Sequence, residues 1–243
     1  MGGRTAKQEI AMRIKDDQMI YIAVLAIVEL YIALSQPWDI AGVSECFFGI
    51  GYADNILLTM KTVFVAGIIV FSGYGQSSRY VKGYGVCQLT RTKKRVYVAG
   101  NVMLRQLTRA VKMSAVILIV HIIVSLLTKE MKFVFTDVFY IGMFILVVYS
   151  ILLWQSILEL KMDERRSTIV VLCAFIVMLY LDGERAFYNI SDKYMLALYV
   201  NMGFKGRMQE AALNKPLAAA VVMFIIAVQC AVLSRIMKKK DIL

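Results

Sequence analysis

The chain has 243 residues, of which 60% are hydrophobic, and a formal net charge of +11. Soluble domains are usually about half apolar, and here the excess is gathered into long blocks, so the composition argues against a soluble domain and predicts a polytopic membrane protein. Most cations lie beside these blocks, where topology and anionic lipid explain them, so the charge does not predict nucleic-acid binding. The four cysteines show neither CxxC pairing nor metal-ligand spacing.

The sequence consists of a short polar segment followed by six apolar runs. Residues 1–18 are polar and basic, and they predict either an interfacial helix lying on the membrane or a solvated tail. Each apolar run is near the ~20 residues that a helix needs to cross about 30 Å of hydrocarbon, the fifth being short. The predicted spans are residues 19–34, 56–71, 113–127, 134–153, 168–181 and 216–236.

The segments between the spans differ in charge. Residues 72–112, named here the basic segment, carry nine Lys or Arg and no Asp or Glu, and residues 159–167 form a predicted charged loop. Lys and Arg near span ends are retained in the cytoplasm. With both termini inside, the cytoplasmic segments hold 20 of the 28 Lys and Arg, and the outer segments hold 7.

The charge pattern therefore predicts an all-α fold: one transmembrane domain over 1–243 with six helices, both termini cytoplasmic, in a bacterial cell membrane. Residues 182–215 form a longer polar segment between the fifth and sixth spans and are expected outside. If this segment partly re-enters the membrane, the stretches AFYNI and YMLALYV are expected to do so, covered by protein.

Three polar residues lie inside the predicted spans. Glu29, Lys61 and His121 are each about six residues from an outer span end, so at about 1.5 Å per residue they share one depth. An unpaired charge there costs on the order of 2–3 kcal/mol, so we expect Glu29 and Lys61 to pair, with His121 within reach. The cluster is either a polar patch on a substrate route or, as we favour, a salt bridge that locks helices together. Gln155 and Gln229 are expected to make inter-helix hydrogen bonds.

Motifs of intrinsic enzymes are missing. The chain has no phosphate-binding loop, no HExxH, no GxSxG and one histidine. The stretch LDGERAFYN at 181–189 resembles the start of the motif of membrane phosphatidyl-alcohol transferases, but Arg185 and Ala186 stand in the wrong order. We therefore expect no catalytic residue, no metal site and no cofactor in this chain.

The basic segment contains a recognisable order of residues. Gly83-Tyr84-Gly85 leads into a few apolar residues, then into the Arg-Thr-Lys-Lys-Arg cluster at 91–95, then into an apolar and basic helix that enters the third span. This order over residues 83–100, together with the six-span layout, resembles the permeases of the type-2 ABC exporter class. Gln76 stands near the place where relatives often carry a glutamate.

The resemblance implies that residues 84–89 form a short coupling helix that docks on a separate ATP-binding subunit, which would hold the ATP and Mg. The basic cluster would then lie at the lipid headgroups or against acidic residues of that subunit; the alternative is a topogenic charge run that contacts only lipid. The docking residues that the resemblance implies are Tyr84, Val86, Cys87, Gln88, Leu89, Arg91, Lys93, Lys94 and Arg95.

The resemblance also implies a second permease, identical or homologous, that encloses a path for an amphipathic or hydrophobic substrate. Small bacterial units of this kind often handle peptides, including bacteriocins. Two alternatives stay open: a self-contained secondary carrier or channel, and a membrane-embedded lipid-processing enzyme. A carrier predicts acids within the spans, and only Glu29 qualifies. A lipid enzyme predicts acidic clusters at an interface, and only the pairs at 163–164 and 182/184 come close.

Overall fold

The computed structural model describes residues 19–31, 56–78, 95–128, 135–188 and 191–239, and within these ranges the chain is helical with no strand. An all-α membrane bundle is therefore confirmed at the level of fold class. Four helices are long and apolar enough to cross a membrane: α5 (Arg95–Thr128), α6 (Thr136–Glu159), α7 (Glu164–Phe187) and α9 (Lys215–Lys239).

The remaining described elements are shorter. A 13-residue apolar helix, Met19–Tyr31, lies beside α5, and α2 (Ile56–Gly73) has 18 residues. Residues 191–214, named here the cap segment, fold as short turns of helix between α7 and α9. They comprise η3 (Asp192–Leu196), η4 (Tyr199–Gly203) and α8 (Lys205–Glu210).

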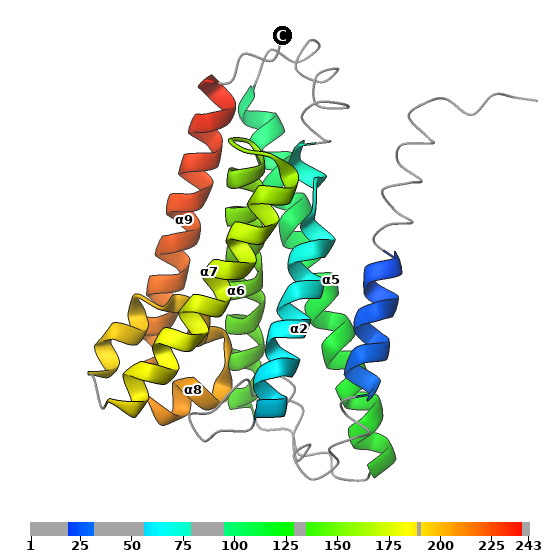
Figure 1. The fold of residues 1–243 in the computed structure, drawn as a ribbon, viewed down its shortest axis with the longest axis vertical. Coiled ribbons are helices and arrows are strands. Elements are labelled where there is room, and N and C mark those ends of the chain that lie inside the picture. The colour runs from blue at the N-terminus through cyan, green and yellow to red at the C-terminus, as the bar shows by residue number, and fades with distance from the viewer. Residues whose placement is uncertain (1–18, 32–55, 79–94, 129–134, 189–190, 240–243) are drawn as a thin grey trace, which may run out of the picture.

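The long helices alternate in direction around α6 (Figure 1). At the upper end in that view, named here the loop end, α2 ends, α5 begins, α6 meets α7 and α9 ends. At the opposite end, named here the cap end, α5 ends, α7 runs into the cap segment and α9 begins. Short connections between helices favour this antiparallel order. The basic segment and the α6–α7 turn thus share one end of the bundle.

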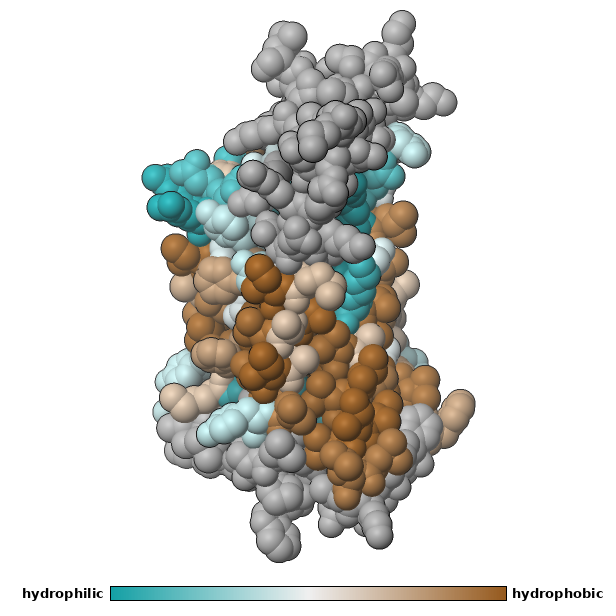
Figure 2. All heavy atoms as spheres, turned by 90° about the vertical axis from the view of Figure 1, so that its right-hand side faces the viewer, coloured by the Kyte–Doolittle hydropathy of each residue, from teal (hydrophilic) through white to brown (hydrophobic). Residues whose placement is uncertain are grey.

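The core lies around α6, which packs against α2, α5, α7, α9 and η4. Its Met143, Val147 and Leu152 are buried, as are Met113 and Ile117 of α5. Large apolar side chains remain exposed on the outside, and Figure 2 shows a broad hydrophobic surface over the middle and lower part of one face, with hydrophilic side chains gathered toward the loop end. Such a surface would be an aggregation liability in water and fits contact with lipid.

The helix expected to enter the third span is present, and the connection after α6 is shorter than predicted. The third predicted span is only the second half of α5, which begins at Arg95, so the last part of the basic segment is helix. The charged loop predicted at 159–167 is present but shorter, covering residues 160–163, since Glu159 is buried in the last turn of α6 and Glu164 opens α7. An acidic residue in the first turn stabilises a helix because the amino-terminal end of the helix dipole is positive.

The predicted fifth span was too short. We expected residues 168–181, whereas α7 has 24 residues. The prediction stopped at Asp182 because a charged residue ends an apolar run; the helix continues because Asp182 is buried against Arg207. The charge is thus compensated by tertiary contact rather than by water.

Local capping explains two helix ends. The chain turns after α2 at Gly75, whose φ of 66° lies in the left-handed region that glycine adopts at little cost. Before α9, the side-chain oxygen of Asn214 accepts a hydrogen bond from the backbone N–H of Leu217 (3.4 Å), and Pro216 occupies the first turn, where its missing N–H is tolerated.

Candidate functional site

The implied docking residues lie mostly outside the described part of the chain. Tyr84, Val86, Cys87, Gln88, Leu89, Arg91, Lys93 and Lys94 fall in 79–94, and Arg95 is the first residue of α5. What the structure describes is how the basic segment is attached on both sides: residues 74–78 before the gap, and α5 after it.

The attachment before the gap depends on two carboxylates from the α6–α7 corner. The buried side chain of Glu159 accepts hydrogen bonds from the backbone N–H groups of Gly75 (2.8 Å) and Ser77 (3.0 Å). The hydroxyl of Ser78 donates to Oε1 of Glu164 (2.8 Å). We call these five residues the anchor. They hold the start of the basic segment to the end of α6 and the beginning of α7.

A buried polar network continues from the anchor to α5. Ser77 Oγ donates to Ser156 Oγ (2.9 Å), which also accepts from the amide Nε2 of Gln106 (2.9 Å). The oxygen of Gln106 accepts from Arg109 (3.0 Å), whose buried guanidinium interacts electrostatically with Glu159. Buried polar groups are stable when they are paired in this way. The network joins the residues that follow α2 to α5 and α6.

Helices α2 and α6 approach each other closely beside the anchor. A Cβ atom added at Gly73 would lie 3.0 Å from Cδ of Gln155 and 3.2 Å from Cδ2 of Leu152, closer than ordinary packing allows. Gln155 Nε2 donates to Thr168 Oγ1 on α7 (3.2 Å), so the predicted inter-helix hydrogen bond is confirmed. α2 and α6 are therefore closely packed beside the anchor.

Glu29, Lys61 and His121 are brought together, as their shared depth predicts. Oε2 of Glu29 lies 3.5 Å from Lys61 Nζ and 3.2 Å from His121 Nε2, so one carboxylate oxygen faces two basic groups from α2 and α5. The Glu29 and His121 side chains are buried, and Lys61 is 13% exposed. If Glu29 is ionised it can only accept hydrogen bonds, and this contact then requires a proton on Nε2 of His121.

The cap segment enters the bundle beside α6 and α9. The hydroxyl of Ser150 lies 3.1 Å from the Tyr199 hydroxyl and 3.0 Å from Oε1 of Gln229. Ser150 is 14 residues into α6, which is about 21 Å along the helix axis. Gly203 packs on Val147, since an added Cβ would lie 3.2 Å from that side chain. The end of the YMLALYV stretch, Tyr199 and Val200, is therefore buried against the bundle, and Gln229 makes its predicted inter-helix contact.

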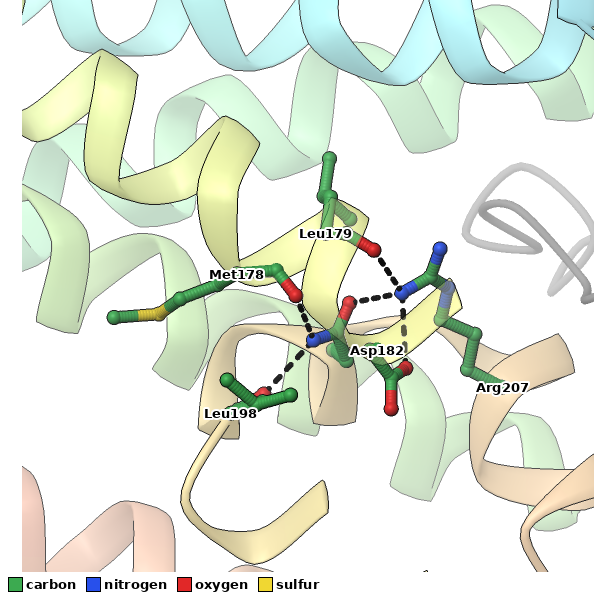
Figure 3. A network of polar contacts seen from close by, with 6 residues as sticks. Met178, Leu179, Asp182, Leu198 and Arg207 are labelled. Atoms are coloured by element: carbon green, nitrogen blue, oxygen red, sulfur yellow. Dashed lines mark hydrogen bonds and ion pairs between the residues drawn. The ribbon is translucent and has the colours of Figure 1, made fainter. Parts of the chain in front are cut away.

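Arg207 fixes the cap segment to α7 (Figure 3). Its Nη1 donates to Oδ2 of Asp182 (2.9 Å), to the carbonyl of Leu179 (3.0 Å) and to the side-chain oxygen of Asn201. Asn201 in turn donates to the carbonyl of Met178 (3.0 Å). We call Arg207, Asp182 and Asn201, all buried, the cap lock. In the sequence, Asp182 suggests only an enzyme-like motif or an interfacial acidic pair, and no pattern indicates its pairing with Arg207.

A second ion pair holds the cap segment to the start of α6. Lys205 Nζ lies 3.3 Å from Oδ1 of Asp137 and 5.9 Å from the centre of the Tyr140 ring. Lys215, at the start of α9, lies 5.1 Å from the same ring centre. A cation over an aromatic face is stabilised by the ring quadrupole. The beginning of α6 is thus surrounded by two cations from later segments.

The described residues offer contacts and ion pairs rather than an evident reaction centre. Within the described ranges, no group of three or more His, Cys, Asp or Glu is arranged to hold a metal ion. No family model matches the chain, and searches of curated proteins and of solved structures found no significant match. What the protein does is therefore inferred from its own geometry.

Proposed function

We propose that this chain is the membrane-spanning permease subunit of an ATP-driven exporter of the type-2 ABC class, and that a separate partner subunit hydrolyses the ATP. The observation that carries the proposal is the continuity of α5, which runs for 34 residues from Arg95 to Thr128. Its first half is the end of the basic segment, and its second half is an apolar span. A partner that displaces residues 84–94 would displace the start of a helix that passes through the bundle.

The packing of α5 supports the same function. Val98, Ala99 and Val102 near its start are buried, and α5 packs along α6 and α9. A movement at the loop end would therefore be passed to the central helices, because close-packed interiors deform little. A flexible linker at this place would absorb the movement instead.

The orientation in this proposal follows from charge. The loop end, which carries the basic segment, faces the cytoplasm with both termini, and the cap segment faces outward, with six spans in a bacterial cell membrane. Two such permeases, or one with a homologous partner, enclose the path. The substrate is amphipathic or hydrophobic, and a peptide fits this description.

Co-purification tests the proposal. The full chain is expressed with an affinity tag in its native host and extracted in mild detergent, and bound proteins are identified by mass spectrometry. We expect an ATPase with phosphate-binding loop and ABC signature motifs, lost at least tenfold in the Tyr84→Glu/Leu89→Glu double variant. Tyr194→Glu, at an exposed position of the cap segment, is the matched control and retains it. Equal ATPase recovery with the double variant would overturn the docking assignment.

A self-contained secondary carrier is the second candidate, and the shared carboxylate of Glu29 favours it. Carriers use buried acids that exchange partners along the transport route. Purified chain in proteoliposomes, with no ATPase added, separates the two: uptake or efflux of a hydrophobic dye or peptide driven by a pH or sodium gradient supports the carrier. Transport that appears only with the ATPase and ATP supports the permease.

A further inference from the structure

We propose that Glu159 is a positioning residue that fixes the start of the basic segment to α6 and α7, and that these two helices form the mechanical link from the loop end to the cap segment. The inference rests on the proposed function, because it describes how movement of a docked partner would reach the far side. It adds a second route beside α5.

The first step is the anchor. Glu159 accepts two backbone N–H groups of a segment that lies more than 80 residues earlier in the chain, so removing its carboxylate would leave both buried donors without this acceptor. Ser78 is held by Glu164 on a different helix. Two attachment points on two helices prevent the segment from pivoting about either one. The start of the basic segment therefore moves with the α6–α7 corner.

The second step is the opposite end of the same two helices. The cap segment contacts α6 through Tyr199 beside Ser150, and it contacts α7 through Asn201 and Arg207, which bond backbone carbonyls of that helix. Carbonyl groups within a helix cannot shift independently of the helix. A rotation or translation of α6 and α7 would therefore carry the cap segment with it.

The third step is the stiffness of the connection. α6 and α7 pack against each other, and each has 24 residues without a described break. The hydrogen bond from Gln155 to Thr168 joins them near the loop end. The two helices are thus held at the anchor, between themselves and at the cap segment, so a displacement has few places in which to be absorbed.

The anchor is tested without any partner. Cys87 lies in the basic segment and accepts a nitroxide spin label once the other three cysteines are replaced by serine. In nanodiscs we expect Glu159→Ala to sharpen the label's EPR spectrum, and Glu159→Gln, which keeps one acceptor oxygen, to give an intermediate spectrum. Asp163→Ala, at the exposed α6–α7 turn, is the control and leaves the spectrum unchanged. An unchanged spectrum in Glu159→Ala would overturn the positioning role.

The link is tested with the ATPase bound. A label at Tyr194→Cys, exposed on η3, reports the cap segment. We expect ATP with vanadate to change this label's spectrum, and Glu159→Ala to reduce the change at least twofold while the partner still binds and hydrolyses ATP. A full change in Glu159→Ala would overturn the link. Should no ATPase bind even the wild-type chain, the proposed function fails, whereas the Cys87 experiment still decides the anchor.

A crosslink provides a test that does not depend on whether the Glu159→Ala variant folds. The hydroxyl oxygens of Ser77 and Ser156 are 2.9 Å apart, so cysteines at these two positions would bring their sulfur atoms close to each other. In a Ser77→Cys/Ser156→Cys chain we expect oxidation to form a disulfide bond and to leave the Tyr194 label response intact, because the joined parts already move together. Loss of the response after oxidation, restored by reduction, would contradict the proposal.

Discussion

The cap lock and the Glu29 cluster both place a carboxylate against basic side chains inside the bundle, but they satisfy those groups differently. In the cap lock, one guanidinium nitrogen of Arg207 meets three fixed acceptors, from Asp182, Asn201 and the backbone of α7. In the Glu29 cluster, one carboxylate oxygen is shared by Lys61 and His121 from two different helices.

The two clusters therefore differ in how rigidly they hold the segments that they join. Arginine donors have fixed directions, so each acceptor around Arg207 is held in place. A lysine ammonium is a compact charge on a flexible stem, and Glu29 keeps a favourable contact when either base moves away. We therefore interpret the cap lock as a determinant of shape, and the Glu29 cluster as a contact that tolerates movement between the Met19–Tyr31 helix, α2 and α5.

The largest effect is expected from breaking the cap lock. Arg207→Ala removes the donor that Asp182 and the Asn201 oxygen share, and removing one partner of a buried ion pair costs about 3–5 kcal/mol. Thermal unfolding of the purified chain in one detergent, compared with wild type, measures the loss. Asp182→Asn, which keeps an acceptor for Arg207, should lose less. Equal stability of Arg207→Ala and wild type would show that the cap segment is not held this way.

A smaller effect is expected at the Glu29 cluster. Lys61→Met leaves Glu29 with His121 as its remaining partner, and we expect a loss of about 2 kcal/mol, within the range for a partly compensated charge in a membrane. The double variant Glu29→Gln/Lys61→Met removes both charges and should recover most of it in the same assay. If Lys61→Met costs as much as Arg207→Ala, the contrast between the cap lock and the Glu29 cluster is wrong.

A neutral hydrogen bond should matter less again. Tyr199→Phe removes the hydroxyl beside Ser150 while keeping the ring, and single polar contacts between membrane helices are worth about 0.6 kcal/mol on average. A shift in melting temperature clearly below that of Lys61→Met is the expected result. Tyr199→Ala, which also removes the ring, serves as the comparison, and a loss in Tyr199→Phe that equals it would assign the effect to the hydroxyl.

The smallest effect is expected from an exposed ion pair. Nε of Arg166, in the first turn of α7, lies 3.5 Å from Oδ2 of Asp163 in the preceding turn. The two side chains are 78% and 75% exposed. Water and salt screen such a pair, so Arg166→Ala should change stability by less than about 0.5 kcal/mol. This variant calibrates the three above, because a large change here would mean that the detergent assay reports something other than buried contacts.

The sequence predicts one of these clusters and not the other, for a physical reason. Glu29, Lys61 and His121 lie on regular helices, where the rise per residue gives each a depth before any packing is known. Arg207 follows two 3₁₀ turns whose path has no such period, so its distance from Asp182 depends on how the cap segment folds. The helical fold class and the approximate positions of the long helices can likewise be predicted from the apolar runs. The exact end of a helix such as α7 cannot, because the helix continues past a charged residue that is paired.

Glu159 shows the same limit at the loop end. In the sequence it stands in a run of charged residues, and such runs are usually solvated. Its carboxylate is buried because it accepts hydrogen bonds from the backbone N–H groups of Gly75 and Ser77, which follow α2. No local sequence pattern indicates this pairing. One feature of the sequence could have indicated this burial: the turn at Gly75–Ser77, whose backbone N–H groups need a hydrogen-bond acceptor. The functional role of the basic segment stays a prediction from resemblance and charge.

The length of α5 determines how far its first residues move when the helix tilts. Thirty-four residues span about 51 Å, whereas the hydrocarbon layer is about 30 Å thick, so roughly 20 Å of the helix extends beyond it. Tilting the helix by about 10° would move its first residues by about 3–4 Å, given that overhang. Under the proposed function, a push on this part of α5 would produce a small rotation among the central helices, with a displacement smaller than the one applied.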